Sequence, residues 1–97
     1  MARFLVEVSH ESDALACVHV LEAFLRSGSH FLTRADWGCK DGDHKAWMIV
    51  DVGTKEEARN IVPSEFRLHT RVVGLNAFTV EEVADMRRHH GGGSSKH

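Results

Sequence analysis

The chain has 97 residues, of which 42% are hydrophobic and 27% charged, and its formal net charge is -2 with neutral histidines. A chain of this length normally holds one domain. Without an excess of basic residues it lacks the concentrated positive surface that binds nucleic acid. No apolar run approaches the roughly 20 residues that cross a bilayer, so we expect neither a nucleic-acid nor a membrane partner.

Histidine is over-represented, with eight copies, whereas cysteine occurs only twice. Imidazole titrates near neutral pH and is the commonest transition-metal ligand, so the excess points to chemistry that involves protons or metals. Two cysteines are too few for a disulfide framework. The N-terminal segment carries Glu7 where a signal peptide needs an apolar stretch. We therefore expect a cytoplasmic protein with reduced thiols.

The first two expected elements are a strand over residues 3–9 and an amphipathic helix over residues 12–27. Phe4, Val6 and Val8 alternate with neighbours of different character, which is the period of a half-buried strand. In the helix, apolar residues recur every three or four positions and form one stripe, which consists of Ala14, Cys17, Val18, Leu21, Phe24 and Leu25. Cys17 falls within this stripe, so we expect it to be a small core residue.

Two further strands are expected over residues 30–38 and 45–52. An Asp-Gly pair lies between them, and this dipeptide between alternating apolar segments is a strong hairpin signal. We expect a two-residue turn at Asp41-Gly42, which fixes the register of the two strands. The predicted pairs are Cys39 with His44, Trp37 with Ala46, and Asp36 with Trp47.

The rest of the domain is predicted as a helix, a strand and a second helix. Two sequences of the capping-box type, Thr54 to Glu57 and Thr79 to Glu82, mark the helix starts. The strand between the helices is expected over residues 67–75. Residues 1–89 then form a single domain. Residues 90–97, rich in Gly, Ser and His, are expected to be a flexible tail.

This order of elements predicts an α+β fold of the ferredoxin-like βαββαβ type with an additional C-terminal helix. The four-stranded antiparallel sheet should have the order 4-1-3-2, with its helices on the face that carries Phe4, Val6 and Val8. The opposite face is left uncovered in a single chain, which favours a sheet-to-sheet dimer. Residues expected at the dimer interface are Leu32, Asp36, Trp47 and Ile49.

The length, element order, third helix and half-apolar open face resemble the dimeric α+β barrel superfamily. The layout is similar to that of small muconolactone-isomerase-like proteins. The resemblance covers residues 1–88, rests on layout, and assigns no catalytic residue to a position of this chain. It implies a homodimer with a pocket for a small organic molecule between each sheet and its helices. Because this superfamily includes isomerases, oxygenases, haem enzymes and non-catalytic binders, the fold does not select a function.

The predicted topology brings three reactive side chains to one end of the sheet. His10 follows the first strand, and Cys39 and His44 flank the hairpin turn. Three interpretations are open: a catalytic site with imidazole as base or Cys39 as nucleophile, a metal site for Zn, Cu or Fe, or polar loop ends satisfied by water. Residues expected to contact a small-molecule ligand are Arg34, Trp37 and His69.

We therefore expect a homodimer that binds a small organic ligand. If it is an enzyme, isomerisation or proton transfer is the expected reaction, and no cofactor is assigned to it. A metal-binding or sensing protein that uses His10, Cys39 and His44 is the alternative. A structural dimer module without catalysis is a third.

Overall fold

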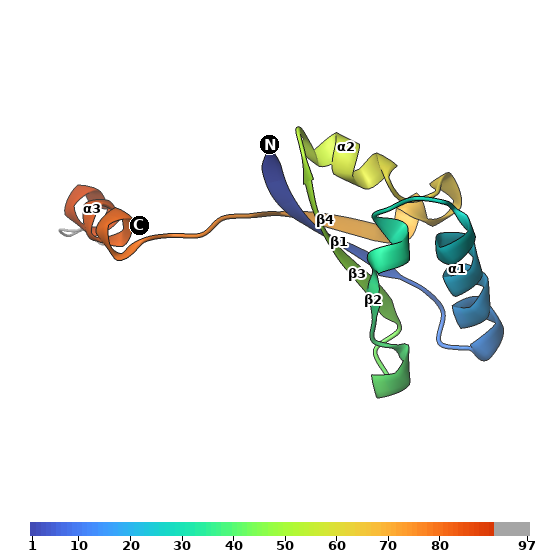
Figure 1. Cartoon of the computed structure of the whole chain (residues 1–97). Coiled ribbons are helices and arrows are strands. Elements are labelled where there is room, and N and C mark those ends of the chain that lie inside the picture. The colour runs from blue at the N-terminus through green and yellow to red at the C-terminus, as the bar shows by residue number, and fades with distance from the viewer. Residues whose placement is uncertain (91–97) are drawn as a thin grey trace.

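The computed structural model describes residues 1–90, so the predicted tail over residues 90–97 falls almost wholly outside the described range. The chain forms an α+β fold around one four-stranded antiparallel sheet (Figure 1). The strands are β1 (Ala2–Ser9), β2 (Asp36–Trp37), β3 (Lys45–Val52) and β4 (Thr70–Leu75). The helices are α1 (Ala14–Arg26), α2 (Lys55–Asn60) and α3 (Val80–His90). The strand order β2-β3-β1-β4 is the predicted 4-1-3-2 order read from the other edge.

The core lies between the sheet and two helices, α1 and α2. Alternate residues of β1 and β3 point into it, so Val6, Val8 and Val50 are almost completely buried. Phe24 of α1 and Ala58 of α2 pack in the same cluster. Full burial of a side chain such as valine or phenylalanine contributes about 1.5–3 kcal/mol each. These contacts hold α1 and α2 on one face of the sheet, as predicted.

The buried stripe of α1 differs from the one predicted. Val20 and Phe24 face the core, whereas Val18 and Leu25 are 56% and 57% exposed. The helix is therefore rotated about its axis relative to the expectation. Cys17 lies three residues before Val20, at the N-terminal end of the buried stripe, and is half-buried rather than enclosed in the core.

The predicted strand over residues 30–38 is wrong except at its end, because only Asp36 and Trp37 pair with β3. Upstream, Ser29 closes a turn: its Oγ accepts from the Leu32 amide at 3.3 Å and its carbonyl accepts from the Thr33 amide at 3.1 Å. A short 3-10 helix, η1 (Leu32–Arg34), follows. This turn places Leu32 in the core at 2% exposure, so its predicted place at a dimer interface is wrong.

The predicted two-residue turn is also wrong, although the predicted pairing of the strands that it joins, β2 and β3, is confirmed. Two-residue hairpin turns require a positive φ at the first central position, here Asp41, but of the two residues only Gly42 has one, with φ 86°. The connection instead forms a second 3-10 helix, η2 (Cys39–Asp41). The carbonyl of Gly38 accepts from the amides of Asp41 and Asp43 at 2.9 and 3.0 Å. The pairs formed are Asp36 with Trp47 and Trp37 with Ala46.

Both predicted capping boxes are present. At each helix start a threonine Oγ accepts from the amide three residues on, and the glutamate there accepts from the threonine amide. The last strand starts later than predicted, because residues 64–69 form the 3-10 helix η3 (Ser64–His69). Among the described residues, no helix is long and apolar enough to cross a membrane.

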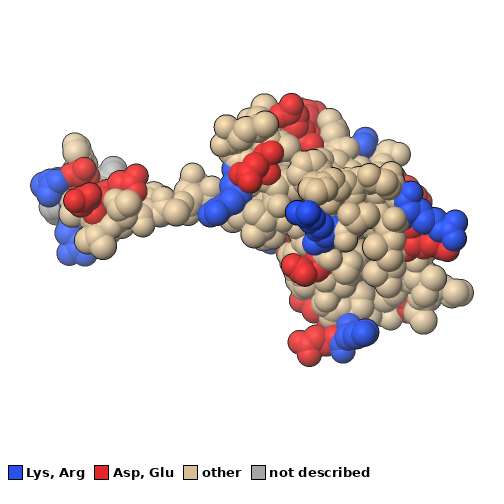
Figure 2. All heavy atoms as spheres, viewed as in Figure 1, with Lys and Arg blue, Asp and Glu red and all other residues tan. Residues whose placement is uncertain are grey.

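The helix α3 stands apart from the sheet at the end of an extended segment (Figure 1). All its residues from Val80 to His89 are exposed. It therefore leaves the sheet face opposite α1 and α2 uncovered. Figure 2 shows acidic and basic side chains mixed over the visible face, without the basic patch typical of nucleic-acid binding.

Candidate metal centre

Four side chains from three parts of the chain meet at one end of the sheet. His10 follows β1, Cys17 lies in the second turn of α1, and Cys39 and His44 belong to the connection between β2 and β3. One donor atom from each lies within 4.8 Å of the other three. All four residues are half-buried. The predicted convergence of three of them is present, and the structure adds Cys17 as the fourth.

The distances between these donor atoms suit a single ion. Cys39 Sγ lies 3.2 Å from His10 Nε2, and Cys17 Sγ lies 3.4 Å from His44 Nδ1. In a tetrahedral zinc site with bonds of about 2.0 Å to nitrogen and about 2.3 Å to sulfur, a nitrogen and a sulfur ligand lie about 3.5 Å apart. These two nitrogen–sulfur distances are within a few tenths of an ångström of tetrahedral spacing, and Cys17 Sγ also lies 3.8 Å from His10 Nδ1.

The orientation of His10 is fixed by a hydrogen bond outside the cluster. Its Nδ1 lies 2.9 Å from the carbonyl oxygen of Glu11. A carbonyl oxygen only accepts, so Nδ1 carries the proton and donates it. The lone pair is then on Nε2, the atom nearest Cys39 Sγ. Metal-binding histidines are commonly held in this way, with the second ring nitrogen bonded to a carbonyl.

Hydrogen bonds that involve no metal ion hold these segments together. The amide of His10 donates to the carbonyl of His44 at 3.1 Å, which extends the β1–β3 pairing past the end of the strands. The Asp13 side chain accepts from the Ala16 amide at 2.8 Å and so fixes the start of α1 one turn before Cys17. Caps of this kind stabilise a helix start by about 1 kcal/mol.

The connection that carries Cys39 depends on a close approach at Gly38. A Cβ at this position would lie 2.7 Å from the carbonyl oxygen of Asp43 and 2.8 Å from the indole ring of Trp47. The indole therefore packs directly against the glycine backbone. Its Nε1 donates to Glu7 Oε1 at 3.1 Å, which ties the ring to β1 as well.

The electrostatic environment favours the neutral form of Cys39 when no cation is bound. Burial raises the pKa of the thiol above its ordinary value of 9.0, and the neighbouring Cys17 and Asp43 raise it further. A free thiolate nucleophile at neutral pH needs a lowered pKa. A bound cation supplies the positive charge that deprotonates such thiols.

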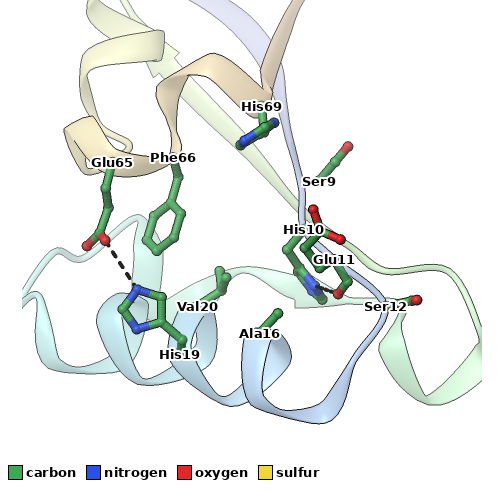
Figure 3. Close-up of a pocket in the computed structure, with 10 residues that line it drawn as sticks. All are labelled: Ser9, His10, Glu11, Ser12, Ala16, His19, Val20, Glu65, Phe66 and His69. Atoms are coloured by element: carbon green, nitrogen blue, oxygen red, sulfur yellow. Dashed lines mark hydrogen bonds and ion pairs between the residues drawn. The ribbon is translucent and has the colours of Figure 1, made fainter.

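A cavity of about 620 Å³ opens beside the cluster, between α1 and η3 (Figure 3). His10 and His69 both line it, as does a hydrogen-bonded pair in which His19 Nε2 lies 3.2 Å from Glu65 Oε1. Val20 supplies part of the apolar surface. His69 therefore lies where a small molecule would contact it, but outside the four-residue cluster.

The other residues expected at a ligand site do not line this cavity. Trp37 packs on Phe24, with ring centroids 5.1 Å apart, and its centroid lies 6.2 Å from that of His10. It supports the cluster from the core side. Arg34 is exposed on η1 and is not among the residues that line the cavity.

The remaining residues expected at a dimer interface keep their predicted face. Asp36 and Trp47 pair across the β2–β3 ladder, and their side chains lie on the face opposite the core. Ile49, two residues along β3, is 64% exposed.

No family model, curated protein or solved structure matches this chain. The four-stranded antiparallel sheet is compatible with the ferredoxin-like layout. The likeness to muconolactone-isomerase-like proteins therefore remains an expectation from the sequence.

Proposed function

We propose that this protein binds one Zn²⁺ ion through His10, Cys17, Cys39 and His44. The observation that supports the proposal most directly is the mutual approach of the four donor atoms within 4.8 Å. Three separate segments contribute them, so the fold itself assembles the set. Two thiolates and two imidazoles form one of the common ligand sets of structural zinc.

The donor types favour zinc over iron and copper. Non-haem Fe²⁺ sites of the common type combine two histidines with a carboxylate, and this group holds no carboxylate. Blue-copper sites use two histidines and one cysteine, with a weak axial donor in place of a second thiolate. A complete set of four protein ligands leaves no coordination position for a substrate. The proposed role is therefore structural or sensory rather than catalytic.

Zinc in this position would crosslink three elements that are separated in the sequence. His10 extends β1, Cys17 belongs to α1, and Cys39 and His44 lie in the β2–β3 connection. Binding there adds to the stability of the fold and fixes the conformation of the connection, because the free energy of metal binding is coupled to folding. Since thiolate ligands must be reduced, we also propose a reducing, cytoplasmic location.

The experiment that tests this proposal is titration of the metal-free protein with Co²⁺, which occupies zinc sites and reports their geometry. We expect strong visible absorption from tetrahedral Co²⁺ and a thiolate-to-metal band, both reaching a maximum at one equivalent and both abolished by zinc. His30→Ala, which changes an exposed histidine outside the cluster, should titrate like the wild type. A weak spectrum of octahedral Co²⁺ would contradict the proposal.

Binding of a small organic molecule is the second candidate function, and the cavity of about 620 Å³ favours it. Its volume is within the usual range for small-molecule sites, and its lining combines imidazole and carboxylate groups with apolar residues. Catalysis by His10, His44 or Cys39 would require such a molecule to reach the cluster. His10 is the residue shared by the two features.

We further propose that a second copy of the chain covers the open face of the sheet around Trp47 and Ile49. The exposure of Ile49 and the distance of α3 from the sheet support this arrangement. Such a dimer accommodates the metal site, because the cluster lies at one end of the sheet. A dimer module with neither metal nor ligand is the third alternative.

A further inference from the structure

The two cysteines of the proposed metal centre lie close enough together to react with each other. Cys17 and Cys39 are 22 residues apart in the sequence, yet their Sγ atoms lie within 4.8 Å of each other. Both are free and half-buried, so neither residue is enclosed in the core. These are the only cysteines in the chain, so within one molecule each has a single possible partner.

The segments that carry the thiols differ in how firmly they are held. Cys17 belongs to the regular helix α1, which is anchored in the core by Val20 and Phe24. Cys39 begins the short 3-10 helix η2, and neither Lys40 nor Asp41 beside it is buried. A disulfide requires a sulfur–sulfur distance of about 2.05 Å. The shift of Cys39 toward Cys17 that this requires involves a surface connection rather than the core.

We infer that Cys17 and Cys39 form a reversible intramolecular disulfide when a hydroperoxide oxidises them, and that zinc is released as the bond forms. The inference rests on the proposed zinc site, whose two sulfur ligands are the groups consumed. Two imidazoles alone bind zinc far more weakly than the full set of four donors. The same cluster then has two states, a zinc-bound reduced state and a zinc-free oxidised state.

The reaction balances with hydrogen peroxide as the oxidant. One sulfur attacks a peroxide oxygen, the O–O bond breaks, and a sulfenic acid and water are formed. The second sulfur then attacks the sulfenic sulfur, the S–O bond breaks, and a second water leaves as the disulfide forms. The two zinc-bound thiolates lose two electrons to the peroxide, which also takes up two protons from solvent, so that both of its oxygens leave as water. Zinc leaves as Zn²⁺ with no change in oxidation state.

The test treats the zinc-loaded full chain with one equivalent of hydrogen peroxide. Zinc release is followed with a chromophoric indicator, and the intact mass and the disulfide-linked peptides are measured on the same samples. We expect loss of nearly all bound zinc, one ion for each disulfide, and loss of two hydrogen atoms from the intact mass. A peptide pair joined through Cys17 and Cys39 should appear, and a dithiol reductant should restore zinc binding.

The control is His30→Ala, which retains both thiols and should respond like the wild type. Retention of zinc, oxidation to sulfinic acid, or crosslinking only between chains would overturn the redox inference while the zinc site still stands. Absence of zinc from the protein before peroxide is added would overturn the proposed function and this inference together.

Discussion

Replacing Cys39 with serine should weaken zinc binding by more than about 100-fold. Loss of a hydrogen-bond partner behind a metal ligand already costs 10–100-fold in affinity, so loss of a ligand itself should cost more. A serine hydroxyl retains the size of the side chain but not the thiolate, which leaves only Cys17 Sγ and two imidazoles around the ion. Competition against a chromophoric chelator measures the affinity directly.

Cys17→Ser gives the sharper comparison, because the sequence and the structure assign this residue different roles. If Cys17 is only a small core residue, the substitution should leave zinc affinity close to that of the wild type. With its Sγ 3.4 Å from His44 Nδ1, we expect a loss as large as that of Cys39→Ser. His30→Ala, a substitution outside the cluster, should retain the zinc affinity of the wild type. Equal zinc affinity in Cys17→Ser and the wild type would show that Cys17 is not a zinc ligand.

Gly38→Ala should destabilise the protein and weaken the metal site at the same time. The added Cβ would lie 2.7 Å from the carbonyl oxygen of Asp43 and 2.8 Å from the Trp47 ring, so backbone or indole must move. Inserting atoms into a filled space costs about 1–3 kcal/mol. For a domain of this size each kcal/mol lowers the melting temperature by roughly 4–8 °C. Displacement of the adjacent Cys39 should also lower zinc affinity.

Gly74→Ala is the matched control for this substitution. A Cβ at Gly74 meets its nearest atom, Cε1 of Phe4, at 3.7 Å, which is an ordinary contact. We expect its melting temperature and zinc affinity to stay near those of the wild type. Thermal unfolding by circular dichroism, with and without zinc, measures both variants. Equal melting temperatures for Gly38→Ala and Gly74→Ala would show that the close approach at Gly38 is unimportant.

Much of the fold could be predicted because local signals and the antiparallel pairing agree. The strand over residues 45–52 and both capping boxes lie where predicted. In an antiparallel pair, the end of one strand lies beside the beginning of the other. The end of β1 and the beginning of β3 therefore lie close together. This is why the proximity of His10 and His44 could be predicted from the sequence, even though the predicted turn between β2 and β3 was wrong.

The errors arose where tertiary contacts override local pattern. Alternation around residues 30–38 suggested a strand, but the Ser29 turn and the burial of Leu32 take precedence. Asp41-Gly42 has the composition of a tight turn, whereas the longer connection uses the left-handed backbone only at Gly42. Local propensity is a weak guide when a hydrophobic side chain such as Leu32 can be buried in another conformation.

Cys17 was missed for a reason that periodicity alone could not resolve. The helix carries apolar residues on both sides of its stripe, so either Val18 or Val20 could have faced the sheet. The choice depends on how the helix rolls against β1, which is a property of packing. Cys17 belongs to the predicted stripe in either case, and with Val20 and Phe24 in the core it lies beside the other donor atoms at the end of the sheet. The fourth member of a metal set could have been sought there, because the beginning of α1 follows His10 directly.

The most direct test of the central claim is the zinc content of the full-length wild-type chain, measured by native mass spectrometry after exposure to excess zinc and buffer exchange. We predict one zinc ion per chain in the wild type and none in Cys39→Ser. The same spectra report whether one or two chains are present and whether a small molecule remains bound. A wild-type chain without zinc, or the same zinc content in Cys39→Ser, would contradict the four-residue metal site.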